Sequence, residues 1–329
     1  MRILKLCAVP IALLAAGCNL SGDSEPEITL EQACNADAEF CGKITADSRC
    51  RNERKDMIIA RHKLMDTRDK QFAFDTLIKT EKFVKCAELA ALIEYKDVKQ
   101  KYAEKDKNRT EPLTDKEIME RERYAKSVAK RNNQKHSNYR HAEAELKKLQ
   151  EWTSFSSIPE LAYYQWSRHN DKEALKRLLD ADEKGKANKA WLQFEISLHY
   201  GKISDEKTLN ALHKSLILLD PEDYTPKDRT GREDKLSIND EGKFYFEAFR
   251  DLANIHFSKE NYASAYVFAT LLEINNDNTA DLDFILRFIE SKSRHKIPYL
   301  EDLAEELHDK LEDGNVTHKF LKKISSIKI

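Results

Sequence analysis

The sequence predicts an all-α protein of helical hairpins stacked as a short solenoid, with a disulfide-stapled hairpin toward its N-terminus. Three observations lead to this prediction. The 8 glycines and 7 prolines are under 5% of 329 residues, against about 12% in an average soluble protein, which argues against turn-rich β-sandwiches, β-barrels and Gly-rich nucleotide folds. Charged residues at 35% beside apolar residues at 40% are typical of amphipathic helices. A helical hairpin pattern also recurs at an offset of 91 residues.

The first twenty residues predict export and a lipid anchor. Arg2 and Lys5 precede an apolar run of about ten residues, half the length of a membrane span, and small residues follow it. The run ends in Leu-Ala-Ala-Gly-Cys at positions 14–18, which resembles the lipobox of bacterial lipoproteins. This resemblance implies acylation of Cys18, and Asn19 in place of a retaining aspartate implies the outer membrane, facing the periplasm of a Gram-negative envelope. The alternative is an ordinary signal peptide with a chance cysteine.

Four cysteines remain after the signal and the anchor, and an even number in an oxidising compartment favours disulfides. The helical spacing predicts one helix over 47–65 and a second over 70–95. An antiparallel hairpin folded between them places Cys50 within one turn of Cys86. A zinc site is the alternative, but the C-x-x-C spacing typical of zinc ligands is absent. The predicted disulfides are therefore Cys50–Cys86 and Cys34–Cys41.

Residues 96–150 are strongly charged, with 16 basic and 10 acidic side chains. Thr114 and Glu117 have the spacing of a capping box, which predicts a long helix from there toward Glu151. A basic helix could bind anionic lipid headgroups or an acidic partner. Because the segment lacks a strong apolar stripe, a solvated charged face is the favoured interpretation.

Residues 161–174 and 252–265 share one pattern without a gap. Each block has Leu-Ala, an aromatic residue four positions after the alanine, then Ser and a basic residue, and predicts two helices joined at Asn170 or Asn261. The pattern resembles tetratricopeptide repeats, in which small residues lie where two helices cross. The predicted packing positions are Ile158, Leu161, Ala162, Ala174, Leu178 and Ala181, and Phe249, Leu252, Ala253, Ala265, Ala269 and Leu272.

A less regular pair of helices is expected between the two blocks. The polar insert at 222–243 predicts a loop. Three helices near 280–292, 298–313 and 317–326 are expected to cap the solenoid. The two stripes of the irregular pair are Ala187, Trp191, Phe194 and Leu198, ended by Tyr200-Gly201, and Leu209, Leu212, Leu216 and Leu219, ended by Asp220-Pro221.

The chain as a whole resembles a family of Gram-negative bacterial lipoproteins classed as a domain of unknown function. The resemblance rests on the stretch from Cys34 to Cys41, on residues 50–58, on Cys86 and on residues 159–166. It implies structural motifs and no activity. The expected domains are a signal peptide (1–17), an acidic flexible tether (18–33), the stapled hairpin (34–95), a charged helical linker (96–152), tetratricopeptide-like repeats (153–292) and a C-terminal helical cap (293–329).

The sequence contains no motif that predicts catalysis, metal binding or phosphate binding. H-E-x-x-H, G-x-S-x-G and G-x-x-x-x-G-K-[ST] are absent. Glu290-Ser291 resembles the catalytic pair of envelope lytic transglycosylases, but only 38 residues follow, too few for a lysozyme-like domain. The net charge of −2 gives no reason to expect a nucleic acid. No cofactor, metal or small-molecule ligand is therefore expected.

A protein-binding surface is the remaining candidate. In tetratricopeptide repeats the first helices line a concave groove, and the helical wheel places five residues away from the packing stripe. Aromatic and arginine side chains on such a face would anchor an extended peptide or a partner helix. The alternative is that Trp166 and Phe257 pack as core. The candidate partner-binding residues are Tyr163, Trp166, Arg250, Asn254 and Phe257.

We therefore expect a lipid-anchored scaffold, not an enzyme, that binds another periplasmic or outer-membrane protein through its repeat surface. A peptidoglycan-acting envelope enzyme is one alternative, and a carboxylate-lined cleft would favour it. A purely structural lipoprotein is the other.

Replacing Cys18 with alanine is expected to abolish lipid attachment, because the lipobox resemblance makes the thiol of residue 18 the acyl acceptor. Metabolic labelling with a palmitate analogue should label the parent chain and leave Cys18→Ala unlabelled, as a soluble or uncleaved precursor. Cys7→Ala is the matched control and should keep the label. Equal labelling of Cys18→Ala would contradict lipidation at this residue.

Overall fold

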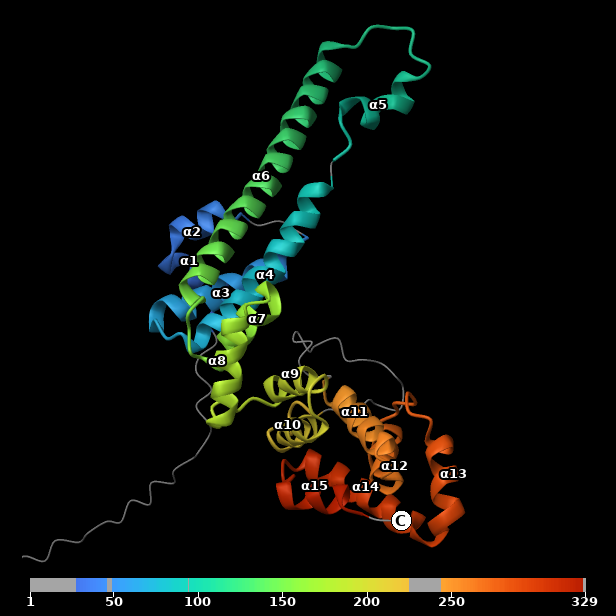
Figure 1. The fold of residues 1–329 in the computed structure, drawn as a ribbon. Coiled ribbons are helices and arrows are strands. Elements are labelled where there is room, and N and C mark those ends of the chain that lie inside the picture. The colour runs from blue at the N-terminus through green and yellow to red at the C-terminus, as the bar shows by residue number, and fades with distance from the viewer. Residues whose placement is uncertain (1–27, 46–48, 94, 225–243, 328–329) are drawn as a thin grey trace, which may run out of the picture. The chain divides into compact units, whose positions relative to one another are not determined.

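The computed structural model describes residues 28–45, 49–93, 95–224 and 244–327 (Figure 1). All regular secondary structure in these residues is helical, which confirms the predicted fold class. The predicted signal peptide, Cys18 and most of the insert at 222–243 lie outside them. No helix among these residues is long and apolar enough to span a membrane.

The helices are α1 (Leu30–Ala36), α2 (Ala38–Lys43), α3 (Arg51–Thr67), α4 (Gln71–Leu92), α5 (Val98–Asp106), α6 (Asp115–Thr153), α7 (Pro159–His169), α8 (Lys172–Glu183), α9 (Ala190–Tyr200), α10 (Asp205–Ile217), α11 (Phe244–Ser258), α12 (Tyr262–Ile274), α13 (Leu282–Ser293), α14 (Ile297–Glu312) and α15 (His318–Ser325).

The contacts divide the chain into two compact units. Unit 1 comprises the described parts of Met1–Arg68 and Lys79–Ala142, and unit 2 those of Asp69–Ile78 and Glu143–Ile329. The first division, after Arg68, falls between α3 and α4, and the other two fall inside the long helices α4 and α6, whereas the sequence suggested boundaries after residues 95 and 152. An uninterrupted helix has no turn residue at such a point, so the sequence offers no signal for the two divisions inside α4 and α6.

Both predicted disulfides are present in unit 1. The Cα atoms of Cys34 and Cys41 lie 5.5 Å apart, and those of Cys50 and Cys86 lie 5.8 Å apart. The longer bridge ties the residue before α3 to α4, as the predicted hairpin requires. It is part of a buried core that also contains Ala33, Ile44, Met57, Ile58, Phe83, Ala87, Ala90 and Ala142.

Residues 30–33, which were expected to belong to the flexible tether, are helical, because α1 begins at Leu30. Thr29 and Gln32 cap the helix reciprocally: the Thr29 N–H donates to Gln32 Oε1 (2.8 Å) and the Gln32 N–H donates to Thr29 Oγ1 (3.2 Å). Leu30 and Ile28 pack against the unit 1 core. A capping box followed by an apolar contact stabilises even a short helix, and this pattern is readable in the sequence.

Helix α6 is one continuous helix of 39 residues. The Glu117 N–H donates to Thr114 Oγ1 (3.4 Å) and the Thr114 N–H donates to Glu117 Oε2 (3.0 Å), which confirms the predicted capping box. Arg109 donates two hydrogen bonds to the Glu117 carboxylate (2.9 and 2.6 Å), and Arg121 donates two to Asp106 (2.7 and 2.5 Å). The Arg121–Asp106 pair binds α5 to α6, and the Arg109–Glu117 pair binds the connection between these helices to α6. Both pairs neutralise part of the basic charge of this segment.

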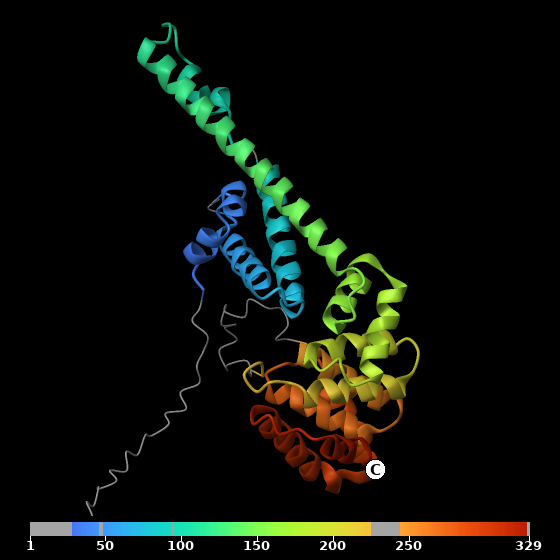
Figure 2. The ribbon, with the colours of Figure 1, turned by 90° about the vertical axis from the view of Figure 1, so that its left-hand side faces the viewer.

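Unit 2 contains three helix pairs, α7 with α8, α9 with α10 and α11 with α12, followed by α13 to α15. Figure 2 shows the yellow, orange and red helices as successive layers. Eleven of the twelve predicted packing positions are at most 6% exposed, and Ile158 is half-buried. In α9 the predicted stripe is wrong at Leu198, which is 44% exposed, because Leu192, Ile196 and Tyr200 form the buried stripe instead.

The two self-similar hairpins differ by one residue at the turn. In the first, Asn170 has a φ of +53° and Asp171 caps α8. In the second, Glu260 has a φ of +58° and Asn261 caps α12. The gapless offset of 91 residues therefore holds for the first helix of each pair and becomes 90 at the cap of the second.

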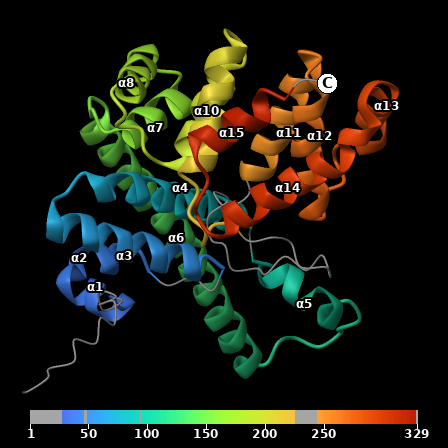
Figure 3. The same ribbon diagram turned by 90° about the horizontal axis from the view of Figure 1, so that it is seen from below.

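The three predicted C-terminal helices are confirmed as α13, α14 and α15, and each contacts α12. Figure 3 shows α14 and α15 lying across the α11–α12 pair. Ser325 at the end of α15 places Oγ 3.2 Å from His213 Nε2 and 3.3 Å from His256 Nε2. A hydroxyl donates only one proton, so at least one of the two rings must donate its Nε2–H to Oγ. This cluster links α15 to α10 and α11.

Unit 2 is expected to lose stability as the pH falls from about 6.5 to about 4. Burial lowers the pKa of His213 to about 4, with His256 and His318 lowering it further, and burial beside Lys259 lowers the pKa of His256 to about 4. The unfolded chain binds protons at these rings near pH 6.5 and the folded chain does not, so stability is complete above that pH and declines below it. Each ring should remove about 2 kcal/mol between pH 7 and pH 5.

Urea unfolding at a series of pH values measures this loss. The double variant His213→Gln/His256→Gln keeps polar side chains without a titration in this range and should show a flatter profile. An unchanged profile in the double variant would assign the pH dependence to other groups.

Candidate functional site

The structure offers no metal centre, within the residues it describes, from three or more His, Cys, Asp or Glu side chains. Glu290 of the transglycosylase-like pair is exposed on α13 and lies 3.8 Å from Arg294, one turn further along the helix. The Ser291 hydroxyl donates to the Phe288 carbonyl (3.0 Å). Both side chains therefore make contacts ordinary for a helix surface.

Two of the predicted partner-binding residues, Tyr163 and Trp166 on α7, lie among other aromatic rings of unit 2. The Tyr163 ring is 6.1 Å from that of Trp166 and 5.3 Å from that of Trp191 on α9. Trp191 in turn stacks on Phe74 at 5.1 Å. Phe74 belongs to the first turns of α4, so the chain's own helix covers this face of α9.

The electrostatics of Tyr163 agree with partial burial. Burial raises the pKa of its hydroxyl well above the ordinary value, and the nearby Glu195 carboxylate raises it further. Burial also raises the pKa of Glu195, as does the charge of Glu247 on α11. The structure thus gives Tyr163 and Trp166 a packing role, and their role in binding stays a prediction.

The other three predicted residues, Arg250, Asn254 and Phe257, line one pocket between α11 and α13. The pocket encloses about 260 Å³, and we call it the α11–α13 pocket. The Phe257 ring lies 5.6 Å from Phe284, which is 45% exposed. Asn254 is exposed at the rim. The remaining lining residues are Ala253, Thr279, Ala280, Asp281 and Ile285.

Arg250 is held in place by the segment between α12 and α13. Its Nε donates to Thr279 Oγ1 (3.0 Å), and its guanidinium lies 3.6 Å from the Asp277 carboxylate, which is 6% exposed. A buried carboxylate is stabilised by such a cation and loses its partner if the arginine is removed. Arg250 therefore orders the pocket wall, and its charge is already compensated.

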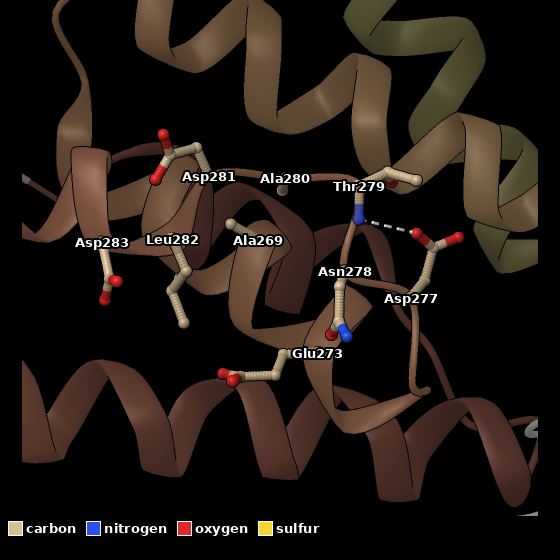
Figure 4. A pocket seen from close by; sticks show the side chains of 9 residues that line it. All are labelled: Ala269, Glu273, Asp277, Asn278, Thr279, Ala280, Asp281, Leu282 and Asp283. Atoms are coloured by element: carbon tan, nitrogen blue, oxygen red, sulfur yellow. Dashed lines mark hydrogen bonds between the residues drawn. The ribbon is translucent and has the colours of Figure 1, made fainter.

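A second, acidic pocket of about 430 Å³ shares Thr279, Ala280 and Asp281 of this segment with the α11–α13 pocket (Figure 4). Four carboxylates line it, from Glu273, Asp277, Asp281 and Asp283, and Ala269 and Leu282 contribute apolar surface. In Figure 4 the Thr279 N–H donates to Asp277 Oδ1 (3.0 Å), which shapes the turn between the two pockets. Asp281 accepts from the Phe284 N–H (2.9 Å) and caps α13.

The sequence analysis did not identify four residues that line or order the α11–α13 pocket: Asp277, Thr279, Asp281 and Phe284. The cap at Asp281 followed by an apolar period was a usable signal for α13 and for the aromatic residue behind the cap. No signal predicted that Asp277 and Thr279 would bind Arg250, because that contact depends on how α12 and α13 pack.

In a comparison with known proteins, the sequence matches one family. The sequence matches the family described as a protein of unknown function (DUF2989) over residues 20–127 and 123–270. No curated protein and no solved structure matches it.

Alanine substitution is expected to distinguish a predicted binding residue that packs inside unit 2, Tyr163, from one that lies on its surface, Asn254. Tyr163→Ala should lower the free energy of unfolding of unit 2 by about 1–3 kcal/mol, because the ring packs on Trp191. Asn254→Ala should change it by no more than about 0.5 kcal/mol, because the side chain is exposed. Urea unfolding measures both. Tyr299→Ala, on a tyrosine that is 45% exposed, is the matched control, and a Tyr163→Ala variant as stable as that control would refute the packing role.

Proposed function

The chain belongs to the DUF2989 family, and we propose that it is a lipid-anchored scaffold of the cell envelope that holds another envelope protein at the α11–α13 pocket. The lipid anchor is Cys18, and the chain faces the periplasm from the outer membrane. The protein has the tetratricopeptide-like groove expected from the sequence, and a partner can reach this groove only along the helices after α10.

One observation carries the proposal. Three residues selected from the helical wheel, Arg250, Asn254 and Phe257, line one pocket together with the half-exposed ring of Phe284. Interface anchors are enriched in aromatic and arginine side chains set in concave surfaces. The α7–α9 face has the same residue types, but Phe74 stacks on Trp191 there. The pocket after α10 is therefore the better candidate for a partner.

The order of the helices supports a groove of the tetratricopeptide type. The candidate residues lie on α7 and α11, which are the first helices of the first and third pairs, and α13 follows the third pair in the chain. In such repeats an extended peptide or a single helix lies along the first helices. The two cross-linked cysteine pairs of unit 1 agree with an oxidising compartment.

Site-directed photocrosslinking in intact cells tests this function. A benzoylphenylalanine, which keeps the phenyl ring and adds a benzoyl group, replaces Phe284, and the matched control carries the same group at Tyr299 on α14, also 45% exposed. The expected result is a discrete adduct with one envelope protein from position 284 and none from position 299. No adduct from either position would leave the structural lipoprotein as the better account.

A further inference from the structure

The exposed face of α11 beside the pocket is acidic. Glu247 and Asp251 lie one turn apart and, among the described residues, neither forms an ion pair. Glu195 on the neighbouring α9 carries a third carboxylate. Arg168 offsets part of the charge on Glu195, and Arg250 offsets part of the charge on Asp251. Glu247 still repels both carboxylates, and a partner that supplies positive charge would relieve this repulsion.

The titration behaviour of these groups agrees with their crowding. Burial raises the pKa of Asp251, and Glu247 raises it further against the opposing effect of Arg250. Burial raises the pKa of Glu195, and Glu247 acts in the same direction. Glu247 is thus close enough to affect a carboxylate on each side of it.

The walls of the two pockets differ in charge, because the α11–α13 pocket is lined by one basic and one acidic side chain, Arg250 and Asp281. Arg250 is the one basic side chain that lines the α11–α13 pocket, and it lies beside Asp277. The second pocket is lined by four carboxylates and no base. A bound segment passing from α11 over the turn at residues 277–281 would therefore meet a net negative charge, to which Glu247 and Asp251 contribute on α11 and Glu273 and Asp283 contribute in the second pocket.

The aromatic residues of the pocket can also accept a cation. Phe257 is 5.3 Å from Tyr262 and 5.4 Å from Phe288, so the rings form one cluster with Phe284. Lys292 Nζ already lies 5.7 Å from the centre of the Tyr262 ring. Ring faces attract ammonium and guanidinium groups when they are partly desolvated.

Building on the proposed function, we propose that the α11–α13 pocket binds a cationic peptide segment, in which lysine or arginine side chains flank an apolar anchor. The anchor fills the pocket against Phe257 and Phe284, and the flanking cations face Glu247 and Asp251 on one side and Asp281 and Asp283 on the other. Anionic lipid headgroups and nucleic acids have the wrong sign for this surface.

Fluorescence anisotropy on the full chain in a nonionic detergent tests the charge preference. The probes are three labelled 12-residue peptides that share one central Phe-Leu pair and differ at four flanking positions, which are all Lys, all Gln or all Glu. The Lys peptide should bind at least tenfold more tightly than the Glu peptide at physiological salt. Equal affinity for the three peptides would overturn the proposal.

Two double variants, each of which removes two negative charges, test whether the preference for the Lys peptide comes from this face. Glu247→Gln/Asp251→Asn should weaken the Lys peptide about three- to tenfold. Asp302→Asn/Glu305→Gln, on exposed positions of α14, should weaken it less than twofold. Equal losses in the two variants would mean that the peptide responds to overall charge and not to this face, and would overturn the site.

Mapping the adduct formed at position 284 separates this inference from the proposed function. A crosslinked partner segment rich in lysine or arginine supports both. A neutral or acidic segment refutes the cationic preference and leaves the scaffold function standing, whereas the absence of an adduct removes the function itself.

Discussion

Ten consecutive residues of α12, 263–272, are buried, so this helix is enclosed on all sides rather than along one stripe. Small residues at Ala263, Ser264, Ala265 and Ala269 let other helices approach its backbone closely. Helices α11, α13, α14 and α15 all contact it. The positions of α11 and α13, and so the pocket between them, depend on this one buried helix.

This dependence explains why the two halves of the predicted groove differ. In the later half, α11 and α13 are each held against α12, and their outward faces are left open on either side of Phe257 and Phe284. In the earlier half, Trp191 of α9 is covered by Phe74, a residue distant in sequence. A large aromatic residue on a first helix can thus serve either as a contact for a partner or as a contact for the chain itself, depending on what else the fold brings to it.

Features that rest on local rules were predictable from the sequence. The reciprocal cap of Thr114 and Glu117, the pairing of Cys50 with Cys86 and the buried positions of the repeat all follow from helical spacing. Leu198 was predicted wrongly: Phe194 of the same predicted stripe is buried, but the side chain one turn further along is 44% exposed. Three site residues on α11 were found by the same wheel argument, but Asp277, Thr279 and the Phe74–Trp191 stack require tertiary contacts that no spacing encodes.

Native-state hydrogen exchange tests most directly whether α12 determines the rest of unit 2. The account predicts that amides of residues 263–272 exchange only through global unfolding of the unit and are its slowest, and that buried amides of α11 near residues 249–253 exchange with them. Exchange of the α12 amides through a local opening, while those of α7 and α8 stay protected, would contradict the central place given to this helix.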